Sequence, residues 1–189
     1  MVVLALDTTT ATGSVALARD GVLLVQHAGD AATTHGERLP GEVVDVLAAR
    51  GLSLADVDAY AVCSGPGSFT GLRVGLATIQ AFALTHGRPV VAVPTLEAIA
   101  YAALAASVSQ GGRPDLVGAL MDAHRQEVFG ALYGSPVVDS PGVTGQTREF
   151  PELVARASPT VGVAERVIDD WVAHAAGSKL HVIGDAVAT

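Results

Sequence analysis

Apolar residues along the first half of the chain form short runs of strand length that alternate with longer stretches of helical spacing. This pattern predicts three antiparallel strands, then two helix–strand pairs and a further helix. Asp20-Gly21, between the second and third runs, is typical of a hairpin turn, and Gly51 and Gly87 each follow a helical stretch, as helix-ending glycines do. The expected strands are residues 2–6, 14–19, 22–26, 59–63 and 90–93. The expected helices are residues 39–50, 72–86 and 95–108, the last capped by Thr95.

The second half of the chain begins after a loop at residues 110–114 and again mixes strand and helix patterns. Residues 134–147 are rich in Gly, Pro, Ser and Thr, which favours a loop or an irregular strand. The expected regular elements are strands at 116–121, 128–133 and 180–183 and an amphipathic helix at 164–175. The first strand of each half ends in an aspartate, Asp7 or Asp122, which hints at a duplicated fold. We therefore expect an α/β protein with an N-terminal lobe at 1–95 and a smaller C-terminal lobe at 96–189.

Composition narrows the possible functions. The 189 residues carry a formal net charge of −8, and their basic residues are scattered, so the basic footprint of an autonomous nucleic-acid binder is missing. Half of the residues are hydrophobic, yet no apolar run is long enough to span a bilayer and the start lacks signal-peptide features. Cys63 is the only cysteine and lies in an apolar strand, which excludes an internal disulfide and fits a cytoplasmic protein.

The segment 64–75, Ser-Gly-Pro-Gly-Ser-Phe-Thr-Gly-Leu-Arg-Val-Gly, joins an expected strand to an expected helix. Such a Gly-rich turn presents backbone N–H groups at a helix N-terminus, and Ser68 and Thr70 are candidate N-caps. The segment is not the dinucleotide-binding fingerprint, because Thr70 stands where the third glycine belongs, and it is not a P-loop, because no lysine follows Gly71. Local chemistry leaves two interpretations open, a tight connector or a site for an anion or a partner.

The nine residues Gly-Pro-Gly-Ser-Phe-Thr-Gly-Leu-Arg at 65–73 closely resemble the signature of the TsaB (YeaZ) family. Three further segments agree with that family in the same order. They are Leu-Ala-Leu-Asp-Thr-Thr-Thr at 4–10 with Ser-Val-Ala-Leu at 14–17, His-Gly-Glu-Arg-Leu-Pro at 35–40, and Met-Asp-Ala-His-Arg-Gln-Glu-Val-Phe at 121–129. The resemblance covers residues 1 to about 133 and becomes loose beyond them.

The resemblance implies a two-lobed, actin-like ATPase fold of ribonuclease H-like topology, with a mixed sheet and helices in each lobe. It implies a non-catalytic partner that activates the catalytic subunit TsaD. With the ATPase TsaE, that complex adds threonylcarbamoyl to adenosine 37 of tRNAs reading codons that begin with A. ATP and metal are then supplied through the partner subunits, and tRNA is met only through the complex. Alone, such a chain forms a homodimer through the same face, and no membrane is involved.

The helix expected from residue 72 is apolar around its whole axis. A helix of this kind is buried all round, so it lies wholly inside the monomer or packs one side against another chain. In the family the two N-lobe helices form these contacts. The candidate partner-contact residues are Leu39, Val43, Val44, Leu47, Gly67, Phe69, Leu72, Arg73 and Leu76. Arg73 stands at the positive end of the helix dipole, so we expect a carboxylate of this chain or the partner to hold it.

Asp7 and the threonines after it lie where actin-like ATPases hold a phosphate and Mg²⁺, and hard cations choose oxygen ligands. The turn has no glycine before Gly13, and Asp and Thr are ordinary turn residues, so Asp7 and Thr8 are candidates for a vestigial nucleotide site at most. An alternative function is an ATP-dependent phosphotransferase of the sugar-kinase type that uses Asp7, Asp122 and the Gly-rich loop. The expected role of Asp122 is nevertheless that of a turn residue paired with Arg125.

The six histidines bear on a third interpretation, a metalloprotease. No two of them are three or four residues apart, so no helix carries a histidine pair of metal-binding spacing. The resemblance sharpens this point, because TsaD carries a His-x-x-x-His pair for its metal, whereas Leu39 stands where a partner of His35 would be. No nucleophile–base pair can be singled out from the sequence either. We therefore expect this chain to bind no metal tightly.

Overall fold

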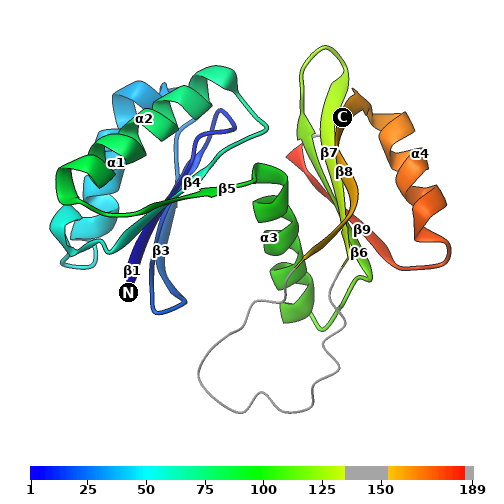
Figure 1. Ribbon diagram of the computed structural model, residues 1–189, viewed down its shortest axis with the longest axis horizontal. Coiled ribbons are helices and arrows are strands. Elements are labelled where there is room, and N and C mark those ends of the chain that lie inside the picture. The colour runs from blue at the N-terminus through cyan, green and yellow to red at the C-terminus, as the bar shows by residue number, and fades with distance from the viewer. Residues whose placement is uncertain (135–152, 186–189) are drawn as a thin grey trace. The chain divides into compact units, whose positions relative to one another are not determined.

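The computed structural model describes residues 1–134 and 153–185. The chain divides into two compact units, Met1–Thr95 and Leu96–Thr189. Each unit contains a mixed sheet with helices packed on it (Figure 1), so the predicted α/β class is confirmed. No helix among the described residues is long and apolar enough to cross a membrane.

The first unit is built on a five-stranded sheet in the order β3-β2-β1-β4-β5. Its strands are β1 (Val2–Asp7), β2 (Ser14–Arg19), β3 (Val22–Ala28), β4 (Ala59–Cys63) and β5 (Val90–Val93). The first three strands pair antiparallel, as predicted, and β4 and β5 continue the sheet in parallel with β1. Between the parallel strands the chain passes through α1 (His35–Ala48) and α2 (Phe69–His86). Right-handed crossovers that advance in one direction place both helices on one face of the sheet.

The core of the first unit lies between this sheet and the two helices, which contact each other and lie side by side (Figure 1). Alternate residues of β1, β2 and β4 point into the core, as the period of a strand requires. On α2 the buried positions recur every four residues, at Gly71, Gly75, Ile79 and Ala83. The helix therefore buries one stripe against the sheet, and glycine and alanine along that stripe let its backbone approach closely.

Both helices begin earlier than the apolar pattern predicts. Helix α1 begins at His35 instead of Leu39, because Thr34 donates hydrogen bonds from its N–H and Oγ1 to the Glu37 carboxylate. The sequence contains this capping signal as Thr-x-x-Glu. Helix α2 begins at Phe69 because Ser68 is its N-cap, and the Ser68 hydroxyl accepts the Gly71 N–H at 3.2 Å. Gly87 ends α2 in the left-handed conformation, as predicted.

The second unit contains a four-stranded sheet in the order β8-β7-β6-β9 between two helices. Its elements are α3 (Thr95–Ser109), β6 (Leu116–Asp122), β7 (Glu127–Gly134), β8 (Val154–Val163), α4 (Ala164–Ala175) and β9 (Leu180–Gly184). Helix α3 packs on one face of the sheet and α4 on the other. The buried Trp171 of α4 fills a recess over Gly118 and Gly130, where an added Cβ would lie 2.5 and 2.9 Å from the indole ring. The helix predicted at 164–175 is confirmed.

Strand β8 is the one strand among the described residues that the sequence pattern misses. It is an edge strand with little apolar alternation, and it contains Pro159, which cannot donate a ladder hydrogen bond. The pairing register with β7 shifts beside this proline, between the pairs Gly130–Thr160 and Leu132–Ala157. Of the loop predicted at 134–147, only Gly134 lies within the described residues, and it is the last residue of β7.

The first strand of each unit ends in the same local structure. Asp7 Oδ1 accepts the Thr9 N–H at 2.8 Å, and Asp122 Oδ1 accepts the His124 N–H at 2.7 Å. Both strands also pair antiparallel with the next strand and parallel with a later one. The hint of a duplicated fold therefore has a structural counterpart. Asp122 interacts with His124, whose Nδ1 lies 3.5 Å from its carboxylate, and not with Arg125 as expected, because three successive left-handed residues at 124–126 turn the chain there.

Candidate functional site

The Gly-rich segment packs directly against the β1–β2 turn. Thr8 is fully buried, and its Oγ1 donates to the Gly71 carbonyl at 2.8 Å, while the Ser68 N–H donates to the Thr9 carbonyl at 2.8 Å. An added Cβ would lie 2.4 Å from Thr9 Cβ at Gly67, 2.0 Å from the Thr8 carbonyl oxygen at Gly71 and 2.2 Å from Thr8 Oγ1 at Gly75. The lack of a side chain at these three positions leaves room for the turn that contains Thr8 and Thr9. Gly67 and Gly71 belong to the family signature, so the signature has a packing role in this chain.

Backbone groups of the same segment bond elsewhere within the unit. The Gly65 N–H donates to Thr95 Oγ1 at 3.1 Å, and the Thr95 N–H donates to the Gly65 carbonyl at 2.9 Å. The Thr95 side chain thus holds the Gly-rich loop. The N–H groups of Gly65, Ser68 and Gly71 all have partners inside the chain, so these three donors are not free for an anion. Of the two open interpretations, this geometry favours the tight connector.

Asp7, the candidate nucleotide-site carboxylate, is engaged in the same turn. Its Oδ1 accepts both the N–H and the Oγ1 of Thr9, at 2.8 and 2.6 Å. It also lies beside Cys63 at the end of β4. Burial, and after it the Asp7 charge, raise the pKa of the Cys63 thiol to about 12. The thiol is therefore protonated at neutral pH and is a poor nucleophile.

We predict that native Cys63 reacts with iodoacetamide at pH 8 about a thousandfold more slowly than the same cysteine in the urea-unfolded chain, since only the thiolate attacks. Because folding raises this pKa, the thiol contributes stability that is complete below about pH 8.5 and is lost as the pH rises towards the folded value. Mass-spectrometric alkylation rates at pH 8, with and without urea, measure the effect. Equal rates in the two states would contradict the prediction.

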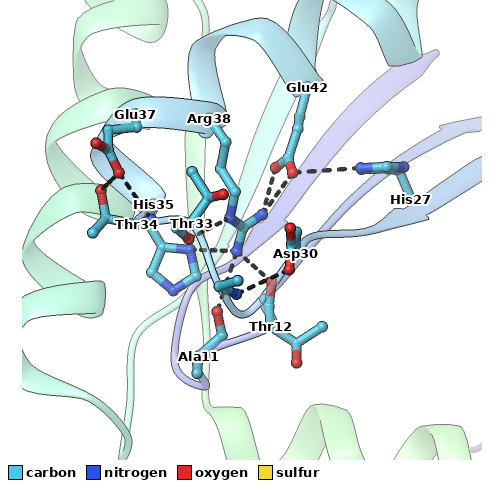
Figure 2. A network of polar contacts seen from close by, with 12 residues as sticks. Ala11, Thr12, His27, Asp30, Thr33, Thr34, His35, Glu37, Arg38 and Glu42 are labelled. Atoms are coloured by element: carbon cyan, nitrogen blue, oxygen red, sulfur yellow. Dashed lines mark hydrogen bonds and ion pairs between the residues drawn. The ribbon is translucent and has the colours of Figure 1, made fainter.

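A partly buried polar network centred on Arg38 holds the start of α1 against the neighbouring loops (Figure 2). The Arg38 and Glu42 side chains are only 8% and 12% exposed, and Arg38 Nη1 lies 2.7 Å from both carboxylate oxygens. Other guanidinium N–H groups donate to the carbonyls of Thr33, Ala11 and Thr12. Gly29 makes room for this arrangement, because an added Cβ there would overlap the guanidinium group. A single arginine therefore links α1 with the β1–β2 turn and the segment before the helix.

His35 belongs to the same network, and both of its ring nitrogens are used. Arg38 Nη2 lies 2.8 Å from His35 Nδ1, and His35 Nε2 lies 2.8 Å from the Thr10 carbonyl oxygen (Figure 2 shows the Arg38 contact). Since a guanidinium only donates and a carbonyl only accepts, Nδ1 is the acceptor and Nε2 carries the proton. His35 thus has no lone pair left for a metal. Across residues 1–134 and 153–185, no three His, Cys, Asp or Glu side chains form a group that could hold a metal ion.

The structure separates the candidate partner-contact residues into three groups. Leu39, Val43 and Leu47 are fully buried in the core of the first unit. The prediction that these three residues contact a partner is therefore corrected, because their side chains have no exposed surface. Gly67, Leu72 and Leu76 are half-buried. Val44, Phe69 and Arg73 are exposed. Helical spacing identified apolar positions, but only the packing of each helix on the sheet decides which of them face outwards.

Helix α2 is not buried all round within its unit. Its outward side carries Phe69, Arg73, Ala77, Ala81 and Leu84, and the exposed fractions of Phe69 and Leu84 are 68% and 84%. The interpretation that this helix lies wholly inside the monomer is therefore wrong for the described residues. The expected carboxylate partner of Arg73 is also absent from them. Instead its guanidinium lies over the Phe69 ring, 4.0 Å from the ring centre, in a cation–π contact.

The second unit brings together a pair that sequence spacing cannot reveal. Ser107 near the end of α3 and His181 on β9 are far apart in the chain, yet Ser107 Oγ lies 3.0 Å from His181 Nδ1. This contact forms because α3 packs on the sheet that β9 extends. Neither residue has a neighbour in the sequence that marks it as part of a site.

Comparison with known proteins identifies a family model, relatives and solved structures that this chain resembles. Residues 27–138, more than half of the chain, match the family model described as "TsaD: tRNA N6-adenosine threonylcarbamoyltransferase". The tRNA threonylcarbamoyladenosine biosynthesis protein TsaB of Haemophilus influenzae is 32% identical over 198 aligned residues, which cover all of this chain and 80% of that protein. An uncharacterised protein of Mycobacterium tuberculosis is 37% identical over 133 residues, 69% of this chain and 58% of its own length.

Among solved structures, YeaZ from Pseudomonas aeruginosa superposes with a TM-score of 0.67 and 34% sequence identity, covering 88% of this chain and 68% of that one. The chain spans less than two thirds of the Mycobacterium tuberculosis relative. Matches over this much of the sequence show that the chain belongs to the family that the TsaD model describes, and within it to the TsaB (YeaZ) group.

Proposed function

We propose that this chain is a non-catalytic partner and activator of a TsaD-like catalytic subunit in the cytoplasm. In this role it works with a TsaE-like ATPase in adding threonylcarbamoyl to adenosine 37 of tRNAs that read codons beginning with A. Its membership of the TsaB group supports the pathway, since the Haemophilus influenzae relative is named for threonylcarbamoyladenosine biosynthesis. Its net charge of −8 favours a role in which tRNA is held by other subunits.

The observation that carries the proposal is the outward side of α2. A stripe that includes Phe69, Ala77, Ala81 and Leu84 faces solvent on a helix with hardly a charged residue. Val44 of the adjacent α1 is also 55% exposed. Apolar side chains gathered on neighbouring helices mark a protein-interaction surface, and the two alanines allow close helix approach. We propose that a TsaD-like subunit covers this surface, and that a second copy of this chain covers it when TsaD is absent.

In this proposal the partner subunits, and not this chain, carry out the chemical reaction. His35 uses both ring nitrogens within the chain, and Asp7 and Thr8 are bonded into the turn that packs on α2. These contacts support an assembly in which ATP and the metal are bound by the other subunits. They weigh against the sugar-kinase alternative, which needs Asp7 and the Gly-rich loop for phosphate, and against the metalloprotease.

Size-exclusion chromatography with light scattering on this protein, alone and mixed with TsaD from the same organism, tests the proposal. We expect a dimer alone and a mixed complex after addition of TsaD, because one surface serves both assemblies. A monomer that ignores TsaD would overturn the proposal. ATP binding and phosphotransfer would then be the next assays, since the kinase alternative requires both.

Leu84→Asp is the substitution that we predict to break these assemblies. Leu84 is 84% exposed in the last turn of α2, so the change costs folding only about 1 kcal/mol, whereas a carboxylate within an apolar contact weakens association at least tenfold, by about 1.4 kcal/mol or more. Leu76 is unsuitable for this test, since it packs partly against the core. Val172→Asp is the matched control, because Val172 is 58% exposed on α4 of the other unit. Light scattering beside circular dichroism decides the outcome, and equal dissociation by both variants would contradict the assignment to α2.

A further inference from the structure

A groove of about 380 Å³ lies in the second unit, between the end of α3, the loop that follows it and the edge strand β9. Its apolar lining comes from Pro114, Leu180 and Val182. Its polar lining comes from Ser107, Arg113, Lys179 and His181. The groove is shallow and open to solvent, and its lining, mainly apolar with a few polar groups, has the composition usual for a small-molecule site.

The groove gathers positive charge in an acidic protein. Lys179 is the only lysine of a chain with a formal net charge of −8, and it lines the groove together with Arg113. Asp115 is the nearby carboxylate, but it accepts the backbone N–H of Lys179 at 2.8 Å. Among the described residues no carboxylate forms an ion pair with the Lys179 ammonium group. The Lys179 ammonium group, which has no ion-pair partner among the described residues, is the positive charge that favours an anion here.

The Ser107–His181 pair adds fixed polar groups. Ser107 is 9% exposed, and its Oγ lies 3.0 Å from His181 Nδ1, which holds the imidazole in place. Because Nδ1 is engaged, Nε2 is the ring nitrogen that remains for a ligand. No described residue makes a hydrogen bond to Nε2. A pre-positioned imidazole loses little conformational freedom when it binds an anion.

We propose that this groove binds a small phosphate monoester, with the phosphate beside Lys179 and His181 and its apolar group on Pro114, Leu180 and Val182. Lysine binds phosphate through charge-assisted hydrogen bonds. This site is independent of the proposed TsaD contact, since all of its residues lie in the second unit and none lies on α1 or α2.

Phenyl phosphate is the probe, because it combines a phosphate dianion with one apolar ring. In ¹⁵N–¹H spectra of the full chain we expect saturable shifts at Gly112 and at residues 179–182. Lys179→Gln is expected to weaken binding about tenfold, through loss of one charge-assisted contact, and His181→Ala to weaken it in the same direction. Arg166→Gln, which removes an exposed cation from α4, is the matched control and keeps the affinity unchanged.

Three further probes separate the contributions of the ligand. Inorganic phosphate tests the anion alone, benzyl alcohol tests the ring alone, and benzoate tests a carboxylate in place of the phosphate. The proposal expects all three to bind more weakly than phenyl phosphate. It is overturned if phenyl phosphate gives no saturable shift at the groove, if Arg166→Gln weakens binding as much as Lys179→Gln, or if benzoate or benzyl alcohol binds equally well.

Discussion

Gly71→Ala is expected to destabilise the first unit by about 3 kcal/mol or more. The new methyl group would stand 2.0 Å from the Thr8 carbonyl oxygen, and this neighbour is backbone, which cannot rotate away. Relief requires α2 and the β1–β2 turn to separate, which also breaks the bond from Thr8 Oγ1 to the Gly71 carbonyl. The loss exceeds the gain in helix propensity from Gly to Ala, which is about 1 kcal/mol in the opposite direction. Urea unfolding followed by circular dichroism measures it.

Gly41→Ala in α1 is the matched control for this substitution. Gly41 is also inside a helix of the first unit, but nothing lies within 4 Å of its added Cβ. We expect the control to be neutral or to stabilise by up to about 1 kcal/mol, through the lower entropy of the unfolded chain. Fluorescence of Trp171, the only tryptophan, follows the second unit separately. If Gly71→Ala is tolerated as well as Gly41→Ala, close packing does not explain the glycine signature.

Arg38→Leu is expected to cost about 2–3 kcal/mol, because it leaves the largely buried Glu42 carboxylate without its partner. The remaining basic side chain near Glu42 would be that of His27, whose Nε2 lies 3.4 Å away on an exposed ring. The carbonyls that Arg38 now caps would also lose their donors, which adds to the cost. The expected result is a lower midpoint of urea unfolding for the first unit with folding of the second unit unchanged.

The double variant Arg38→Leu/Glu42→Leu distinguishes the two sources of this cost. With both charges removed, no buried carboxylate is left unpaired, so the double variant should be more stable than Arg38→Leu alone. A double variant that is equally or less stable would show that the carbonyl contacts, and not the orphaned charge, dominate. Either way, Arg38 joins three separate segments through one guanidinium group, a role that the fork of arginine can fill and lysine cannot.

For two sequence motifs, the contacts in the fold give a different role from the one that the sequence predicts. The Gly-rich segment reads in sequence as a loop that offers N–H groups to an anion, and in the fold those of Gly65, Ser68 and Gly71 are bonded within the chain. His35 reads as half of a missing metal pair, and in the fold it is a hydrogen-bonding link between Thr10 and Arg38. Residue type and spacing state what a group is able to bind, whereas the surrounding atoms decide what it does bind.

The sequence by itself determined the α/β class, the antiparallel opening strands, α4 and the family, since these depend on local periodicity, turn residues and a contiguous motif. The capping signal Thr34-x-x-Glu37 was also present, although the apolar pattern outweighed it. Tertiary structure alone decided which apolar residues of α1 and α2 face outwards, because helical spacing marks a stripe and packing on the sheet selects which side is covered. It also decided the Ser107–His181 pair and strand β8. Contacts between residues distant in the chain depend on how elements pack, and no local pattern in a single sequence records them.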